Sequence, residues 1–223
     1  MMPSTLSFPI EFSGAGIRCI RGERIVFSGL NFAVAAGGAL LLSGPNGSGK
    51  SSLLRVMAGL LPVASGVLRR DGADIRDDPE SHRASLHYVG HLDAVKPVLS
   101  VTENLAFWAG MRSPDRNAVS LVDAALDTFG LALLGDMPAR LLSAGQRRRL
   151  NLARLVASQA PLWLLDEPTV ALDAVSVKTT VGCIADHRAG GGIVVLSTHI
   201  DLGIEEATTI ALDDFCVTAE ETA

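Results

Sequence analysis

The stretch that decides the fold reads Gly44-Pro45-Asn46-Gly47-Ser48-Gly49-Lys50-Ser51. It fits the pattern G-x-x-x-x-G-K followed by Ser or Thr at every required position. An apolar run, Leu40–Ser43, precedes it, and a stretch with helical spacing, Ser51–Leu60, follows it. Glycines in such a loop let backbone N–H groups turn inward around phosphate oxygens, and the helix start adds a positive dipole end. The sequence therefore predicts a strand, a phosphate-binding loop and a helix, in that order.

Two side chains of this loop carry the expected chemistry. Lys50 is expected to reach the β- and γ-phosphates of ATP, as a catalytic residue, and the Ser51 hydroxyl to bind Mg²⁺. The alternative is a glycine-rich turn without a ligand, which the Lys-Ser pair and the strand–loop–helix context disfavour. The predicted nucleotide contacts here are Gly44, Pro45, Asn46, Gly47, Ser48, Gly49, Lys50, Ser51 and Ser52.

A second motif, Leu162-Trp163-Leu164-Leu165-Asp166-Glu167, predicts a buried strand that ends in two acids. Asp166 is expected to hold Mg²⁺ through water, and Glu167 to accept a proton from the attacking water as general base. An ordinary turn is the alternative reading of such a strand end. The phosphate loop upstream makes the catalytic interpretation the better one, so ATP and Mg²⁺ are the expected ligands.

Short apolar runs alternate with helical stretches along the chain. Predicted strands are Ile17–Ile20, Ile25–Phe32, Leu40–Ser43, Gly66–Arg70, Leu86–Val89, Leu162–Asp166, Ile193–Ser197 and Thr209–Leu212. Helical apolar spacing predicts helices over Ser51–Leu60, Val101–Ala109, Ala118–Phe129, Ala144–Ala157 and Ala174–Arg188. This alternation favours an α/β fold with a largely parallel sheet and a mostly helical insertion over about Asp93–Ser158.

The stretch Leu142-Ser143-Ala144-Gly145-Gln146 resembles the signature sequence of ATP-binding-cassette (ABC) ATPases. The resemblance implies a second helix N-terminus that faces phosphate, with Ser143, Gly145 and Gln146 directed at the γ-phosphate held by another copy of the chain. Each chain would then complete its neighbour's site. The alternative is a plain helix cap, since serine is a favoured N-cap residue.

The order of motifs matches the ABC family over nearly the whole chain. It implies an α/β P-loop cassette with an N-terminal antiparallel β portion, a parallel-sheet core and an inserted helical subdomain at about 93–158, all in one domain, 1–223. Asp173 lies in a segment that resembles the family's dimer-contacting loop, where Val170 replaces the usual small hydroxyl residue. His199 matches the switch histidine that contacts the γ-phosphate, and is expected to be catalytic.

One departure from the general pattern points to a subfamily. His91 follows Lys50 by 41 residues, where ABC ATPases carry a Gln that contacts Mg²⁺ and relays ATP binding to the partner. The pattern formed by Gly90-His91, Lys96 and residues 99–107 (LSVTENLAF), joined to residues 142–155 (LSAGQRRRLNLARL), closely resembles the ATP-binding subunits of cytochrome c maturation transporters, the haem exporter ATPases. His91 is therefore expected to contact nucleotide and metal and to act in coupling.

This resemblance implies a peripheral protein on the cytoplasmic face of a bacterial inner membrane. Two copies would form a homodimer on binding ATP and pair with an integral membrane permease subunit. ATP turnover would drive haem export, or release of haem from a periplasmic haem chaperone. Other function classes stay open: the ATPase of another small-molecule exporter, or a soluble ABC ATPase that acts on DNA or ribosomes.

A second departure concerns the base. ABC ATPases stack adenine on an aromatic residue about two dozen residues before the phosphate loop, and Arg21 stands there in this chain. A guanidinium plane can also stack on a base. The sequence thus predicts weak base recognition and a modest preference for ATP over GTP.

Charge and composition argue against nucleic-acid-binding, disulfide-stabilised and membrane-spanning proteins. A net charge of −5 disfavours nucleic acid as a partner, and the basic run Arg147-Arg148-Arg149 with Arg154 is interpreted as a solvated helix face. The three cysteines are far apart, as expected in a reducing compartment. No secretory signal is recognised, and no apolar run reaches the ~18 residues of a membrane span.

Haem ligation by His87 and His91 is disfavoured, because extended chain would separate their Cα atoms by ~13 Å.

Overall fold

The structure is a computed structural model that describes residues 11–112 and 117–216. The chain forms two compact units. The first consists of Met1–Tyr88, Pro161–Glu167 and Ala185–Ala223, and the second of Val89–Ala160 and Pro168–Ile184. No helix within the described residues is both long and apolar enough to cross a membrane.

The first unit contains a four-stranded antiparallel sheet. Its strand order is β2-β1-β4-β5, and each pair of neighbours is antiparallel. The left-handed conformation of Gly22, with φ +61°, allows the tight turn between the two long strands. The strands are β1 (Phe12–Arg21), β2 (Arg24–Val34), β4 (Ser65–Arg70) and β5 (Ala73–Asp74).

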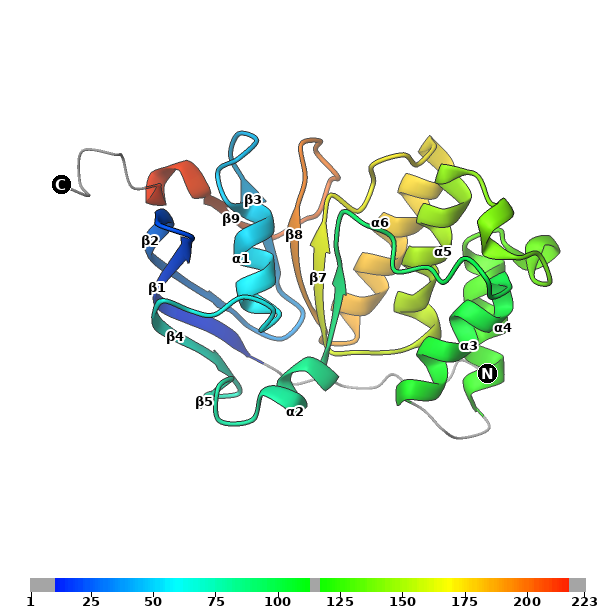
Figure 1. The fold of residues 1–223 in the computed structure, drawn as a ribbon, viewed down its shortest axis with the longest axis horizontal. Helices are drawn as coiled ribbons and strands as arrows, with labels where there is room; N and C mark the ends of the chain where they lie inside the picture. The colour runs from blue at the N-terminus through cyan, green and yellow to red at the C-terminus, as the bar shows by residue number, and fades with distance from the viewer. Residues whose placement is uncertain (1–10, 113–116, 217–223) are drawn as a thin grey trace. The chain divides into compact units, whose positions relative to one another are not determined.

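A five-stranded sheet in the same unit has the order β6-β7-β8-β3-β9, and β7, β8, β3 and β9 are parallel. β7 and β8 are buried along their whole lengths, as continuous apolar runs in a parallel sheet are. The parallel strands β3, β7 and β8 end at one edge of the sheet (Figure 1). Their last residues are Ser43, Asp166 and Ser197. The strands are β6 (Leu86–Val89), β7 (Leu162–Asp166), β8 (Ile193–Ser197), β3 (Ala39–Ser43) and β9 (Ala207–Ala211).

Helix α1 (Lys50–Met57) packs on β7 and β8 and also on β1 of the other sheet. Leu53, Leu54 and Met57 are fully buried in the apolar core that these elements share. The helix that begins at the phosphate loop is therefore fixed from both sides. A short helix, α2 (Pro79–Ala84), precedes β6.

The second unit contains three helices that contact one another, α3 (Val101–Arg112), α4 (Asn117–Thr128) and α5 (Ala144–Ala157). Two short 3₁₀ turns, Ala132–Leu134 and Ala139–Leu141, join α4 to α5. The loop before α3 is shaped by buried Asn104, whose side chain accepts a hydrogen bond from the Lys96 amide and donates to the Lys96 and Ser100 carbonyls. Helix α6 (Ala174–Ala189) begins in this unit and ends in the first.

The predicted fold class is confirmed, and β6, α5, β7 and β8 have the predicted bounds. The helix predicted over Ser51–Leu60 was wrong at its end: α1 stops at Met57, and Gly59 adopts φ +66° beyond it. Helix α2 was not predicted, although Asp78 and Pro79 carried its signal. The Asp78 side chain caps the helix by accepting from the Ser81 amide, and proline occupies the first turn.

Candidate active site

The phosphate loop lies between β3 and α1 in the first unit. Gly44, Gly47 and Gly49 have φ values of +128°, +85° and +105°, a region that side chains disfavour. A Cβ on Gly44 would lie 2.9 Å from Ser48 Oγ, and one on Gly49 would lie 2.7 Å from Val26 Cγ1. Glycine at these positions is thus a backbone requirement of the loop.

Lys50 opens α1 and is 7% exposed. Its Nζ donates to the Gly44 carbonyl at 2.7 Å and to the Pro45 carbonyl at 3.0 Å, so the ammonium group is folded onto the loop. The Ser48 hydroxyl is buried and has no hydrogen-bond partner. Buried polar groups are almost always paired, so a buried hydroxyl without a partner fits a loop that takes up ligand oxygens.

The end of β7 carries the two acids. Asp166 is 3% exposed, and its Oδ1 accepts a hydrogen bond from Ser197 Oγ at 2.8 Å. Glu167 follows with φ +48°, a strained conformation for a residue with a side chain. Its amide donates to the Ser197 carbonyl at 3.2 Å and to Ser197 Oγ at 3.1 Å. A strained backbone that neighbouring groups hold in place is typical of functional sites.

The role of Ser197 was not predicted from the sequence. Its hydroxyl donates to Asp166 and accepts from the Glu167 amide, which uses both capacities of a hydroxyl. The signal was available, because Ser197 ends β8 and β8 is the strand next to β7. A serine at that place reaches the acids of the neighbouring strand.

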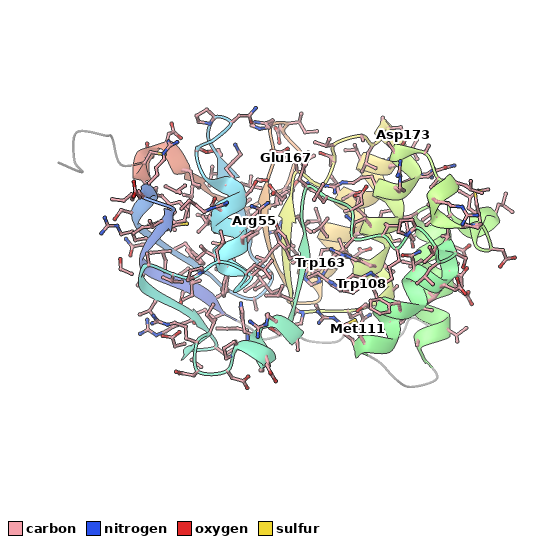
Figure 2. The ribbon with its side chains drawn as sticks, viewed as in Figure 1. Arg55, Trp108, Met111, Trp163, Glu167 and Asp173 are labelled. Carbon is pink, nitrogen blue, oxygen red and sulfur yellow. The ribbon has the colours of Figure 1, made fainter. Side chains whose placement is uncertain are left out.

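His199 joins two motifs that lie far apart in the sequence. Its Nε2 lies 3.0 Å from Asn46 Oδ1 and 3.3 Å from Glu167 Oε1. The imidazole is half-exposed, whereas the Glu167 side chain is 18% exposed. The first unit thus brings the phosphate loop, the predicted base and the predicted switch histidine together. Figure 2 shows Glu167 beyond the end of β7, the strand that also bears Trp163.

In the second unit the signature stretch forms the start of α5. Ser143 Oγ accepts from the Gln146 amide at 3.2 Å, and Gln146 Oε1 accepts from the Ser143 amide at 2.8 Å. These reciprocal bonds form a capping box. The helix-cap interpretation of Ser143 therefore holds, and it is compatible with an exposed surface that meets phosphate.

The predicted dimer loop lies against this helix start. Ala171 has φ +65°, and a Cβ on Gly145 would lie 3.2 Å from the Ala171 carbonyl oxygen, so the glycine permits a close approach. Asp173 caps α6: its Oδ1 accepts from the Ser176 amide at 2.8 Å. Hydrogen bonds from Ser176 lower the pKa of Asp173.

The interpretation of the arginine run as a solvated face was wrong for Arg148 and Arg154. Arg147 is exposed, but Arg148 is 5% and Arg154 3% exposed, because α5 is buried on most sides. The Arg154 guanidinium lies 4.6 Å from the centre of the Trp108 ring. Burial, and then the charge of Arg148, lower the pKa of Arg154 to about 10.

Two predicted contacts stay predictions. His91 is exposed in the loop that follows β6, so it is not a packed residue. Arg21 is exposed at the end of β1, opposite Arg24, and within the described residues no hydrogen bond or ion pair joins it to the phosphate loop. Within the described part of the chain, no three or more His, Cys, Asp or Glu side chains cluster so that they could hold a metal ion.

Most of the site residues described above lie in a segment that matches a known protein family. The sequence model of the ABC transporter family matches residues 27–170, and the chain belongs to this family of ATP-binding proteins. Two solved structures share the fold. The ATP-binding subunit of an ABC transporter has a TM-score of 0.82 at 21% identity, covering 90% of this chain and 86% of its own. A putative ABC transporter ATP-binding protein from Pyrococcus furiosus has a TM-score of 0.79 at 22% identity, covering 93% and 100%.

Curated relatives narrow the family. The chain is 58% identical to the cytochrome c biogenesis ATP-binding export protein CcmA of Paramagnetospirillum magneticum, over 94% of this chain and 97% of that protein. It is 56% identical to the CcmA of Rhodospirillum rubrum, over 93% and 88%. Within the ABC transporters the chain therefore belongs to the CcmA family. It is an ATP-binding subunit, and its activity is ATP hydrolysis.

Proposed function

We propose that this chain hydrolyses ATP between two of its copies, with Glu167 as general base, and drives a membrane partner in cytochrome c maturation. The observation that carries the assignment of the base is the strained Glu167 backbone, fixed by Ser197 and joined through His199 to Asn46 of the phosphate loop. The wider role follows from similarity to relatives named for cytochrome c biogenesis and export.

In this proposal each of these side chains has a defined role. Lys50 leaves the Gly44 and Pro45 carbonyls and pairs with phosphate oxygens. Glu167 accepts a proton from the attacking water, while the His199 imidazole orients the carboxylate and contacts the γ-phosphate. Ser197 keeps the Asp166 carboxylate and the Glu167 backbone in place. The first unit would thus bind nucleotide and activate water.

Magnesium is the proposed cofactor. The buried Asp166 carboxylate and the Ser51 hydroxyl offer oxygen ligands, the type that Mg²⁺ prefers. Few protein ligands suffice, because Mg²⁺ keeps several waters and binds substrate phosphates. Bound there, Mg²⁺ would neutralise charge on the β- and γ-phosphates.

The base is tested by Glu167→Gln. We expect ATP binding to persist and single-turnover hydrolysis to fall ~10²–10⁴-fold, the usual range for a lost general base. ATP should then trap a dimer on size-exclusion chromatography, because hydrolysis normally reopens the interface. Near-normal hydrolysis would assign the base elsewhere, with His199 the next candidate.

The second copy is proposed to contribute Ser143, Gly145 and Gln146 to the γ-phosphate, with Asp173 at the dimer contact. Ser143→Arg should abolish hydrolysis while single chains still bind ATP. Mixing this variant with Lys50→Ala should restore at most one site per dimer, the one with an intact loop and an intact signature. Normal hydrolysis by Ser143→Arg would exclude the composite site.

We place the complex at the cytoplasmic face of the bacterial inner membrane, with an integral permease as partner. Its ATP turnover would serve haem export, or release of haem from a periplasmic haem chaperone. Cells that lack the chain should lose haem attachment to c-type cytochromes, and wild type, but not Glu167→Gln, should restore it. Normal c-type cytochromes in such cells would favour another small-molecule exporter.

His91 is proposed to couple ATP binding to the permease. Because it is exposed in the loop after β6, it is accessible to nucleotide or partner. An imidazole can replace an amide as a hydrogen-bonding group, so His91→Gln should be tolerated. His91→Ala should keep basal ATPase activity and lose stimulation by the permease in nanodiscs. Equal stimulation of all three proteins would remove His91 from coupling.

A further inference from the structure

The Arg148 guanidinium lies inside the second unit and bonds to two loops at once. Its Nε donates to the Pro168 carbonyl at 3.2 Å. Its Nη1 donates to the Gly90 carbonyl at 3.0 Å and lies 3.2 Å from Asp93 Oδ1. The side chain is 6% exposed and that of Asp93 is 27% exposed, so solvent screens this ion pair only in part.

The two backbone partners of Arg148 are each next to a functional residue of the proposed site. Gly90 immediately precedes His91 in the chain, and Pro168 immediately follows Glu167. Arg148 itself is on α5, the helix that Ser143 caps. One buried side chain therefore connects the signature helix, the coupling loop and the segment that begins beside the base.

The chemistry of the group suits such a connection. A guanidinium carries its N–H donors in one rigid plane, so the directions in which it bonds are fixed together. Asp93 Oδ1 is held from a second side by Asn151 Nδ2, at 3.1 Å. Backbone carbonyls accept the other bonds, so the arrangement depends on where the two loops lie and tolerates changes in their side chains.

We propose that Arg148 is a positioning residue for hydrolysis: it holds the His91 loop and the segment after Glu167 in one arrangement with the signature helix. A movement of the loop at Gly90 and Asp93, imposed by the permease, then displaces the chain at Pro168, the residue bonded to Glu167. The inference rests on the proposed role of Glu167 as base. It makes Arg148 the link between partner and chemistry.

The experiment compares Arg148→Met with Arg147→Met, which removes the same charge from an exposed position one residue earlier. Both are made in the full chain. In Arg148→Met we expect kcat to fall about 10–100-fold, the scale of a small misplacement of catalytic groups, with little change in KM for ATP. Hydrogen exchange should rise in residues 90–96 and 168–173 together, while residues 44–50 stay as in the wild type. Arg147→Met should match the wild type in both measurements.

Two milder variants keep the test valid if Arg148→Met does not fold. Arg148→Lys keeps the charge and loses the planar fork, so we expect part of kcat to return while exchange at 168–173 stays high. Asp93→Ala removes the side chain that anchors the loop to Arg148, and combining it with Arg148→Lys should lower kcat by less than the product of the two single losses. Wild-type kcat in every folded Arg148 variant, or faster exchange confined to α5, would overturn the proposal.

The two assignments fail separately. If Glu167→Gln blocks hydrolysis and the Arg148 variants turn over normally, only the positioning role is lost. If Glu167→Gln hydrolyses ATP normally, the base is elsewhere, whatever the Arg148 variants do. A kcat loss in Arg148→Met with both loops as protected as in the wild type would indicate a role other than positioning.

Discussion

The helices α1 and α5 both begin at a proposed phosphate contact, but their N-termini are built differently. The N-cap of α1 is Gly49, in a left-handed conformation without any side-chain cap. The N-cap of α5 is Ser143, whose side chain forms a capping box with Gln146. No side chain caps the first helix end, whereas polar side chains cap the second.

A similar difference separates the phosphate loop from a loop of the second unit. The phosphate loop needs glycine at three places with positive φ, and its helix start has free N–H groups for a ligand. In the second unit Asn104 shapes the loop before α3. In the proposed dimer the signature end would exchange its own cap bonds for phosphate, at a cost of about 1 kcal/mol for each bond. The start of α1 can therefore accept phosphate without losing a side-chain cap, whereas the start of α5 would lose its cap bonds.

The largest expected effect comes from Gly49→Ala. A Cβ there would meet Val26 Cγ1 at 2.7 Å and Phe27 Cδ1 at 3.2 Å, at φ +105°. Strain of about 1–3 kcal/mol, together with this overlap, should weaken ATP binding about 100-fold by isothermal titration calorimetry. The matched change in the other helix, Gly145→Ala, meets only the Ala171 carbonyl at 3.2 Å. It should leave ATP affinity of the single chain intact and reduce hydrolysis. An equal loss of affinity in both variants would erase the distinction.

The sequence predicted local features, such as the phosphate loop and the bounds of α5, better than contacts between elements that are distant in the chain. Glycine, lysine and serine at fixed spacing specify the phosphate loop, because few other residues adopt its dihedral angles. Ser197 and Arg148 were not foreseen, since their roles depend on which strands and loops become neighbours in space. Arg148 is buried because α5 is surrounded on most sides. The spacing of residues in a charged run does not show this.

Acid should destabilise the first unit more than the second, because four of the five histidines in the sequence belong to the first unit. His187 stacks on Trp163 with centroids 3.9 Å apart, and burial lowers its pKa to about 4 from an ordinary value near 6.5. Burial also lowers the pKa of His82. Between pH 6.5 and 4 the unfolded chain binds more protons, so stability present above pH 6.5 is lost as pH falls, by up to about 3 kcal/mol for His187.

The measurement is urea unfolding at pH 7.5, 5.5 and 4.5, followed by hydrogen exchange of each unit. Exchange should rise first in the first unit. His187→Phe keeps a ring against Trp163 and has no proton to gain, so its stability should depend less on pH. The same pH dependence in wild type and His187→Phe would assign the acid sensitivity to other groups.

The smallest effect concerns the signature cap and decides between its two interpretations. Ser143→Ala removes the cap and should cost about 1 kcal/mol of stability in urea unfolding. Ser143→Asn keeps a favoured N-cap residue, so its stability should stay close to that of the wild type. If Ser143 also contacts the phosphate of a second copy, both variants should lose ATP-dependent dimerisation in the Glu167→Gln background. Because asparagine restores the cap but not the small hydroxyl, a stable Ser143→Asn chain that still fails to dimerise assigns the loss to the phosphate contact. A Ser143→Asn chain that dimerises like the parent protein would reduce Ser143 to a helix cap, and the two helix ends would then differ in function as well as in construction.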